Sequence, residues 1–143
     1  MIKIQIEGLD RVVNNLQKFQ AGLPQFFNDT MQKTILYVQG KLPPYPPPPT
    51  GSTYRRTGTL GRSITSLFGQ HPDALSKIQP FGGGVHGIIG TKLKYAPFVI
   101  DEDRQAGVHR GRWWTLQQAV RNQTQAIVDY WKKAVDLYIK RYL

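Results

Sequence analysis

A run of prolines in the first half of the chain limits the folds that are open to it. Six of the ten prolines lie between residues 42 and 64, at positions 43, 44 and 46–49. Because proline fixes φ and lacks an amide donor, this run excludes a helix interior or a central strand. It predicts a stiff polyproline II segment.

The sequence directly after the prolines is basic and contains no acid. It holds the candidate contacts to a phosphate or a protein partner, which are Tyr54, Arg55, Arg56 and Arg62. Long loops in small domains are usually functional or disordered. We therefore expect residues 43–62 to form a proline-rich basic arm, and a plain linker is the alternative.

The chain before the arm has two kinds of periodicity. Residues 2–6 alternate isoleucine with polar residues, which predicts a half-buried strand. Asp10 is then the predicted N-cap of a helix. Apolar residues recur at helical spacing in two stretches, at positions 9, 12, 13, 16 and 19 and at positions 27, 31, 35, 38 and 42. Because Gly22 and Pro24 lie between these stretches, we expect either two N-terminal helices or one kinked helix.

The middle of the chain has the composition of a small antiparallel sheet. Residues 63–68 are rich in β-branched and aromatic residues and predict a strand. Residues 69–84 contain two prolines and three consecutive glycines, which indicates a hairpin connection, and residues 85–89 predict a second strand. Residues 92–100 are ambiguous, because Pro97 argues against a central strand.

The end of the chain predicts one long helix from Trp114 to Tyr142. Its apolar stripe consists of Leu116, Val120, Ile127, Trp131, Val135, Tyr138 and Tyr142. Three apolar residues lie off this stripe and are candidate subunit contacts: Val128, Leu137 and Ile139. The alternative is a helix that is buried on two sides within its own domain. The whole pattern predicts a single α+β domain spanning residues 1–143.

Composition narrows the classes of function. The chain has 143 residues and no run of 18 apolar residues, so we expect no membrane span. The absence of cysteine excludes disulfides and thiolate metal sites. The net charge of +10 favours a polyanionic partner such as nucleic acid, and a role in solubility alone is the alternative.

Motifs for catalysis or cofactor binding are weak. The glycines of residues 82–87 match Gly-x-Gly-x-x-Gly, but they precede a predicted strand and open no helix, so we expect a turn. Asp101, Glu102, Asp103 and His109 have ligand atoms without the spacing of a metal site. We expect no enzyme, no catalytic, cofactor or metal site, and no small-molecule substrate. Trp113 and Trp114 follow arginines and could stack on bases, although anchoring the last helix to the core is favoured.

Four short motifs in order resemble a known family. They are Gly8-Leu9-Asp10, Thr57-Gly58-Thr59-Leu60-Gly61-Arg62-Ser63-Ile64, Ile88-Ile89-Gly90-Thr91 and Tyr95-Ala96-Pro97-Phe98-Val99, followed by the C-terminal helix. This order resembles the small tail-completion, or head–tail joining, proteins of long-tailed double-stranded DNA bacteriophages and prophages. The chain departs from the family pattern by the insertion of residues 44–56 and by Ile100-Asp101-Glu102-Asp103 after the last motif.

The resemblance implies a structural virion protein without enzymatic activity. Such proteins are made in the bacterial cytoplasm and lie at the neck or the head-proximal end of the tail. They work as a homo-oligomeric ring that contacts connector and tail-tube proteins and lets double-stranded DNA pass. A small basic module that binds DNA independently of sequence is the alternative, and a metal-dependent nuclease that uses residues 101–103 is a third hypothesis.

Overall fold

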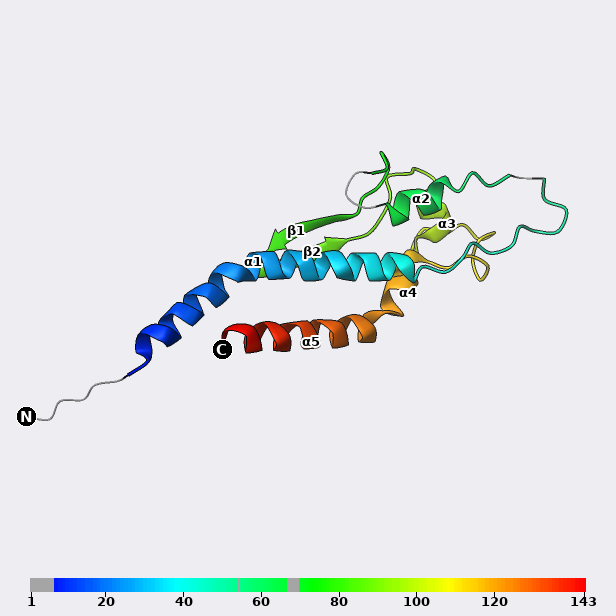
Figure 1. Ribbon diagram of the computed structural model, residues 1–143. Helices are drawn as coiled ribbons and strands as arrows, with labels where there is room; N and C mark the ends of the chain where they lie inside the picture. Colours follow the sequence, from blue (N-terminus) through cyan, green and yellow to red (C-terminus); the bar gives the residue numbers. More distant parts are fainter. Residues whose placement is uncertain (1–6, 54, 67–69) are drawn as a thin grey trace, which may run out of the picture.

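The computed structural model describes residues 7–53, 55–66 and 70–143 (Figure 1). Its spine is one long helix, α1 (Leu9–Gly40). A short antiparallel hairpin and the last helix, α5 (Thr124–Tyr142), both pack on α1. The layout of helices, a two-stranded antiparallel sheet and a long C-terminal helix is α+β, as the sequence predicts.

The N-terminal region is a single helix, so the alternative with two separate helices is wrong. α1 runs through Pro24 without ending, and it bends within its first half in Figure 1. Proline removes one helical hydrogen bond and crowds the preceding turn, which accounts for a bend at this place. The predicted N-cap is also wrong, because Gly8 holds that position with φ 81° and Asp10 lies in the first turn. The strand predicted at residues 2–6 lies outside the described residues.

The predicted strand at residues 63–68 is wrong where the structure describes it. Thr59–Thr65 form the helix α2, and Ser66 follows in an extended conformation. Leu60 and Ile64 are four residues apart, so one helical turn places both in the core. Gly58 begins the helix with φ 73°, a left-handed conformation that favours glycine.

The sheet is one hairpin, β1 (Lys77–Phe81) and β2 (Gly84–Ile88), with Phe81 paired to Gly84 next to the turn. The second strand agrees with prediction, but the first lies inside the segment predicted as a connection. Gly87 lets the hairpin approach α1 closely, because a Cβ there would collide with the sulfur of Met31. The ambiguous segment contains the short helix α3 (Ala96–Ile100), whose first turn accepts Pro97.

The predicted C-terminal helix is divided in two. α4 (Leu116–Arg121) and α5 are separate helices with a break at residues 122–123. The Thr115 side chain caps α4 by accepting a hydrogen bond of 3.3 Å from the Gln118 amide. The break lets α4 pack beside the core while α5 turns to run antiparallel along α1, as Figure 1 shows.

Two packing regions hold the fold together. The first is a small core of Leu60, Ile64, Ala96 and Ile100, surrounded by half-buried residues that include Trp113 and Trp114. The second joins α1 to α5 through aromatic rings: Phe19, Phe26, Phe27, Trp131, Tyr138 and Tyr142. Two long-range hydrogen bonds fix this pair, from Trp131 to the Thr34 hydroxyl and from the Tyr138 hydroxyl to the Phe19 carbonyl.

Candidate functional site

The first part of the arm is bound to the body of the protein. The carbonyl of Pro44 accepts a hydrogen bond of 3.3 Å from Trp114 Nε1, and the carbonyl of Pro47 accepts one of 3.1 Å from Arg112. The Tyr45 hydroxyl accepts a hydrogen bond from the Gly61 amide. An extended proline-rich segment leaves its carbonyls free to accept such bonds. These contacts set the direction in which the rest of the arm leaves the body (Figure 1).

Arg56 faces inward and takes part in this attachment. Its guanidinium lies 5.2 Å from the centre of the Trp113 ring and 5.8 Å from the centre of the Tyr45 ring. It also donates a hydrogen bond to the carbonyl of Pro46. Arg56 therefore fastens the end of the arm to its beginning. Trp113 and Trp114 both pack against the core, which agrees with the prediction that they anchor the last helix to it.

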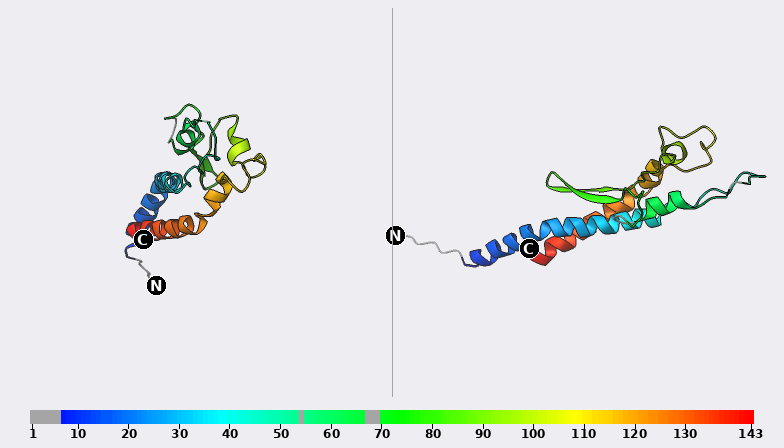
Figure 2. Two further views of the ribbon diagram at one scale, coloured as in Figure 1. Left: turned by 90° about the vertical axis from the view of Figure 1, so that its right-hand side faces the viewer. Right: turned by 90° about the horizontal axis from the view of Figure 1, so that it is seen from above.

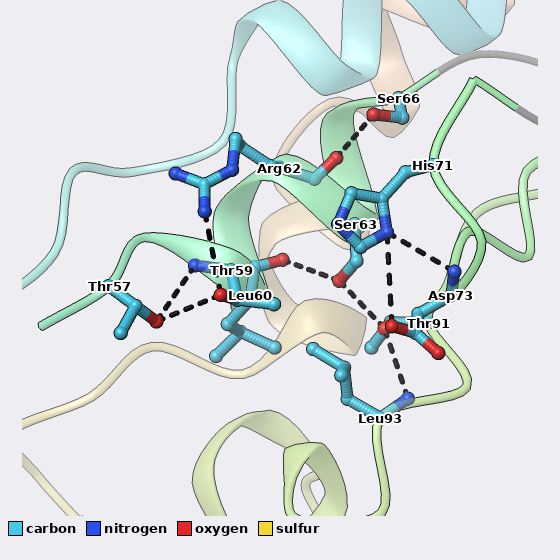
Figure 3. Close-up of polar contacts among 10 residues, drawn as sticks. All are labelled: Thr57, Thr59, Leu60, Arg62, Ser63, Ser66, His71, Asp73, Thr91 and Leu93. Atoms are coloured by element: carbon cyan, nitrogen blue, oxygen red, sulfur yellow. Dashed lines mark hydrogen bonds and ion pairs between the residues drawn. The ribbon is translucent and has the colours of Figure 1, made fainter.

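The other basic residues of the arm lie apart from Arg56. Arg62 is exposed on α2 and reaches Thr59 Oγ1 at 3.5 Å, while the buried Ser63 hydroxyl points the other way to Thr91 at 2.7 Å (Figure 3). Arg55 is exposed, and Tyr54 lies outside the described residues. Of the predicted basic cluster, Arg55 and Arg62 are exposed and Arg56 is held by Tyr45, Pro46 and Trp113, and the contact of these residues with a phosphate or a partner stays a prediction.

The three predicted subunit contacts on α5 are exposed but do not share one face. Val128 is 39% exposed and Ile139 is 41% exposed, and together with Val135 and Trp131 they line an open hollow along α5. Leu137 is 58% exposed and lines a different hollow, between α5 and α1. No residue within Thr124–Tyr142 is fully buried. We call the surface formed by Val128, Trp131, Val135 and Ile139 the α5 face.

A second exposed apolar surface lies at the start of α1 and was not predicted as exposed. Leu9, Val12, Val13 and Leu16 are between 42% and 54% exposed. They continue the side of α1 that takes α5, but α5 ends at Tyr142, whose ring contacts Phe19 of α1. Figure 2 shows these turns of α1 extending past the C-terminus. A helix of 19 residues cannot cover one of 32, but the sequence predicted a last helix of residues 114–142, so this difference in length is seen only in the structure. We call these four residues the α1 stripe.

The acidic loop is occupied by contacts within the chain. The Asp103 amide and the Arg104 guanidinium both donate to Asp101 and lower the pKa of its carboxyl group. Two hydrogen bonds of 2.7 and 2.9 Å from Arg121 lower the pKa of Glu102. Within the described part of the chain, no group of three or more His, Cys, Asp or Glu side chains is placed to hold a metal ion. The loop thus connects the α3 region to α4.

The helices carry no membrane signature in residues 7–53, 55–66 and 70–143, because none combines the length and the hydropathy that a membrane-crossing helix needs. The geometry instead offers two apolar helix faces and an attached proline arm with two exposed arginines, Arg55 and Arg62. Comparison with known proteins adds no relative: no family model, no curated protein and no solved structure matches the chain.

Proposed function

We propose that this chain is a structural subunit of a phage virion, which assembles with its own copies into a ring between the head connector and the tail tube. The observation that carries the proposal is the amount of surface that the single chain leaves open. Its accessible surface is 10374 Å² for a mass of 16.3 kDa. A compact monomer of that mass is expected to expose about 7,500 Å².

Part of this accessible surface consists of two apolar helix surfaces, the α1 stripe and the α5 face, which a neighbouring subunit could cover. The α1 stripe and the aliphatic residues of the α5 face are exposed side by side at helical spacing, which differs from the scattered apolar residues of ordinary surfaces. Among the described residues, no group of three or more His, Cys, Asp or Glu side chains beside either face is placed to hold a metal ion. An assembly subunit gains stability when neighbours cover such faces, whereas a monomer gains nothing from them.

The charge of the chain suits contact with DNA in transit. The net charge of +10 would lower the electrostatic cost of bringing phosphates through the opening of a ring. The order of the four sequence motifs is the further support for this class of protein. In this proposal the chain performs no turnover, and its activity consists of fitting between its neighbours.

Co-assembly tests the proposal most simply. The purified chain is mixed with connector and tail-tube proteins of a long-tailed phage and viewed by negative-stain electron microscopy. We expect rings with a central opening that is wide enough for duplex DNA, attached to one end of the tube or connector. A chain that stays a free monomer in every mixture would count against the proposed function.

A DNA-binding module is the second candidate, and the exposed Arg55 and Arg62 favour it. Fluorescence anisotropy with a labelled duplex at low salt measures this property. A binding module would lose affinity steeply as salt rises, and Arg55→Ala with Arg62→Ala would weaken binding to every sequence alike. Absence of binding at low salt would remove this candidate and leave the ring proposal intact.

A further inference from the structure

We propose that the hollow between α1 and α5 binds the phosphate backbone of duplex DNA. The inference rests on the proposed function, in which DNA passes the chain, and it names the surface that meets the DNA. We call this hollow the α1–α5 groove. Its charged and phenolic residues are Lys33, Lys133, Arg141, Asp29, Tyr130, Tyr138 and Tyr142.

Three cations line the groove without carboxylate partners. Lys33 comes from α1, Lys133 and Arg141 come from α5, and all three side chains are exposed. Among the described residues, no ion pair involves any of them. By contrast, Lys140, the residue before Arg141, is paired with Asp136 at 2.7 Å. The groove therefore gathers positive charge that the chain itself leaves uncompensated.

One acid also lines the groove, and it does not cancel this charge. Asp29 lies one turn from Lys33, but its carboxylate accepts a hydrogen bond of 2.6 Å from Gln25 and forms no ion pair in the described part of the chain. Just outside the lining, Lys18 on α1 and Asp129 on α5 offset each other. Three cations and one acid leave the lining with a net charge of about +2, so the groove attracts an anion.

The hydrogen-bonding groups of the groove are mostly donors. Lysine and arginine side chains donate only, and a phenol hydroxyl donates readily. The hydroxyl of Tyr138 already donates to the Phe19 carbonyl, whereas those of Tyr130 and Tyr142 make no hydrogen bond within the described residues. A phosphate backbone offers acceptors alone, but an acidic polypeptide also brings an amide donor with each residue. The lining therefore favours DNA phosphates over an acidic peptide.

The groove is long enough for several phosphates. Tyr130 and Tyr142 both line it and lie about 18 Å apart along α5. Duplex DNA advances about 3.4 Å per base pair, so the groove follows about five base pairs. The hollow has a volume of about 580 Å³. Because three cations make few phosphate contacts, binding is weak and salt-dependent, which suits DNA that has to move past the chain.

Fluorescence anisotropy of a labelled duplex, titrated at several salt concentrations, tests the groove. The groove variant carries Lys33→Gln and Lys133→Gln. The matched control carries Lys92→Gln and Lys94→Gln, which remove the same charge from exposed lysines before α3. We expect the groove variant to weaken binding about tenfold and to reduce the slope of log K against log salt by about 2. The control should weaken binding less than about threefold.

A second variant should strengthen binding, which misfolding cannot imitate. Asp29→Asn removes the one acid of the lining and should raise the affinity about threefold at low salt. Asp103→Asn removes an exposed acid from the loop before α4 and should change the affinity less than about 1.5-fold. Circular dichroism checks that every variant is folded.

No binding by the unmodified chain at low salt, or equal losses from the groove and control variants, would overturn the inference. A larger loss from Arg55→Ala with Arg62→Ala would also overturn it, as would displacement of the duplex by polyglutamate as readily as by unlabelled duplex. The assay needs no ring, so the two proposals fail separately. Rings without an effect of the groove variant contradict this inference alone, and groove-dependent binding without rings contradicts the proposed function alone.

Discussion

Replacement of Arg56 by alanine tests whether this arginine stabilises the proline arm or is free to bind a phosphate. Its guanidinium lies within about 6 Å of two ring centres, and each such contact contributes about 0.5–1 kcal/mol. A hydrogen bond from a charged donor to the Pro46 carbonyl contributes about 1.5–3 kcal/mol. Because Arg56 is only half-buried, we take the lower end and expect Arg56→Ala to lower the free energy of unfolding by about 2 kcal/mol.

Urea unfolding followed by tryptophan fluorescence measures this loss, since Trp113 is one of the contacted rings. The matched control is Arg55→Ala, which removes the same charge from the neighbouring exposed residue and should change stability by less than about 0.5 kcal/mol. Arg56→Lys keeps the charge but loses the planar group that stacks on the rings, so it should recover less than half of the loss.

Equal stability of Arg56→Ala and Arg55→Ala would refute the assignment. The arm would then be held by contacts other than those of Arg56, and Arg56 would again be a candidate contact to a phosphate. A large loss for both variants would also refute it, because the structure gives Arg55 no comparable contact with the rings.

Three further predictions concern packing and charge. Gly22→Ala should destabilise the protein by about 1 kcal/mol because the added Cβ meets the Tyr138 hydroxyl, and in a Tyr138→Phe background the same change should stabilise it by about 0.5–1 kcal/mol through helix propensity. Ile64→Ala removes a side chain that is 0% exposed and should cost about 2–5 kcal/mol in chemical denaturation, and a cost below 1 kcal/mol would contradict the described core. Because the pKa of Glu102 is lowered in the folded protein, its ion pair contributes fully to the stability of the fold above pH 4.5. This contribution is lost as the pH falls through the lowered pKa. Arg121→Gln should raise that pKa in a carbon NMR titration, and an unchanged pKa would contradict the ion pair.

Periodicity predicted the helical parts of this fold better than composition predicted its strands. The apolar stripes located α1 and α5 because a period of 3.6 residues persists over many turns. Residues 63–66 contain Ile64 and Thr65, which favour strands, yet the helix forms because Leu60 and Ile64 must reach one core. Tertiary burial overrides local propensity in so short a segment. The strand at Lys77–Phe81 was missed because Pro80 argues against a strand and three glycines follow at residues 82–84.

The candidate surfaces were predicted in part. Val128, Leu137 and Ile139, which lie off the main stripe of the last helix, are exposed, but the spacing alone did not separate the two sides of α5, and their role as subunit contacts stays a prediction. The exposed start of α1 could not follow from periodicity, because an apolar stripe looks the same whether or not a partner covers it. Likewise a count of charges cannot tell the inward Arg56 from the outward Arg55, which depends on rings more than ten residues away in both directions.

Self-association is the property on which the account depends, and light scattering coupled to size-exclusion chromatography measures it directly. The account predicts that the mass of the unmodified chain rises with concentration from 16.3 kDa to a fixed multiple of that value, and that Val12→Asp shifts the half-point of this rise about tenfold or more. Leu137→Asp, on the other hollow, should shift it less than about twofold. A constant mass of 16.3 kDa at every concentration would contradict the account.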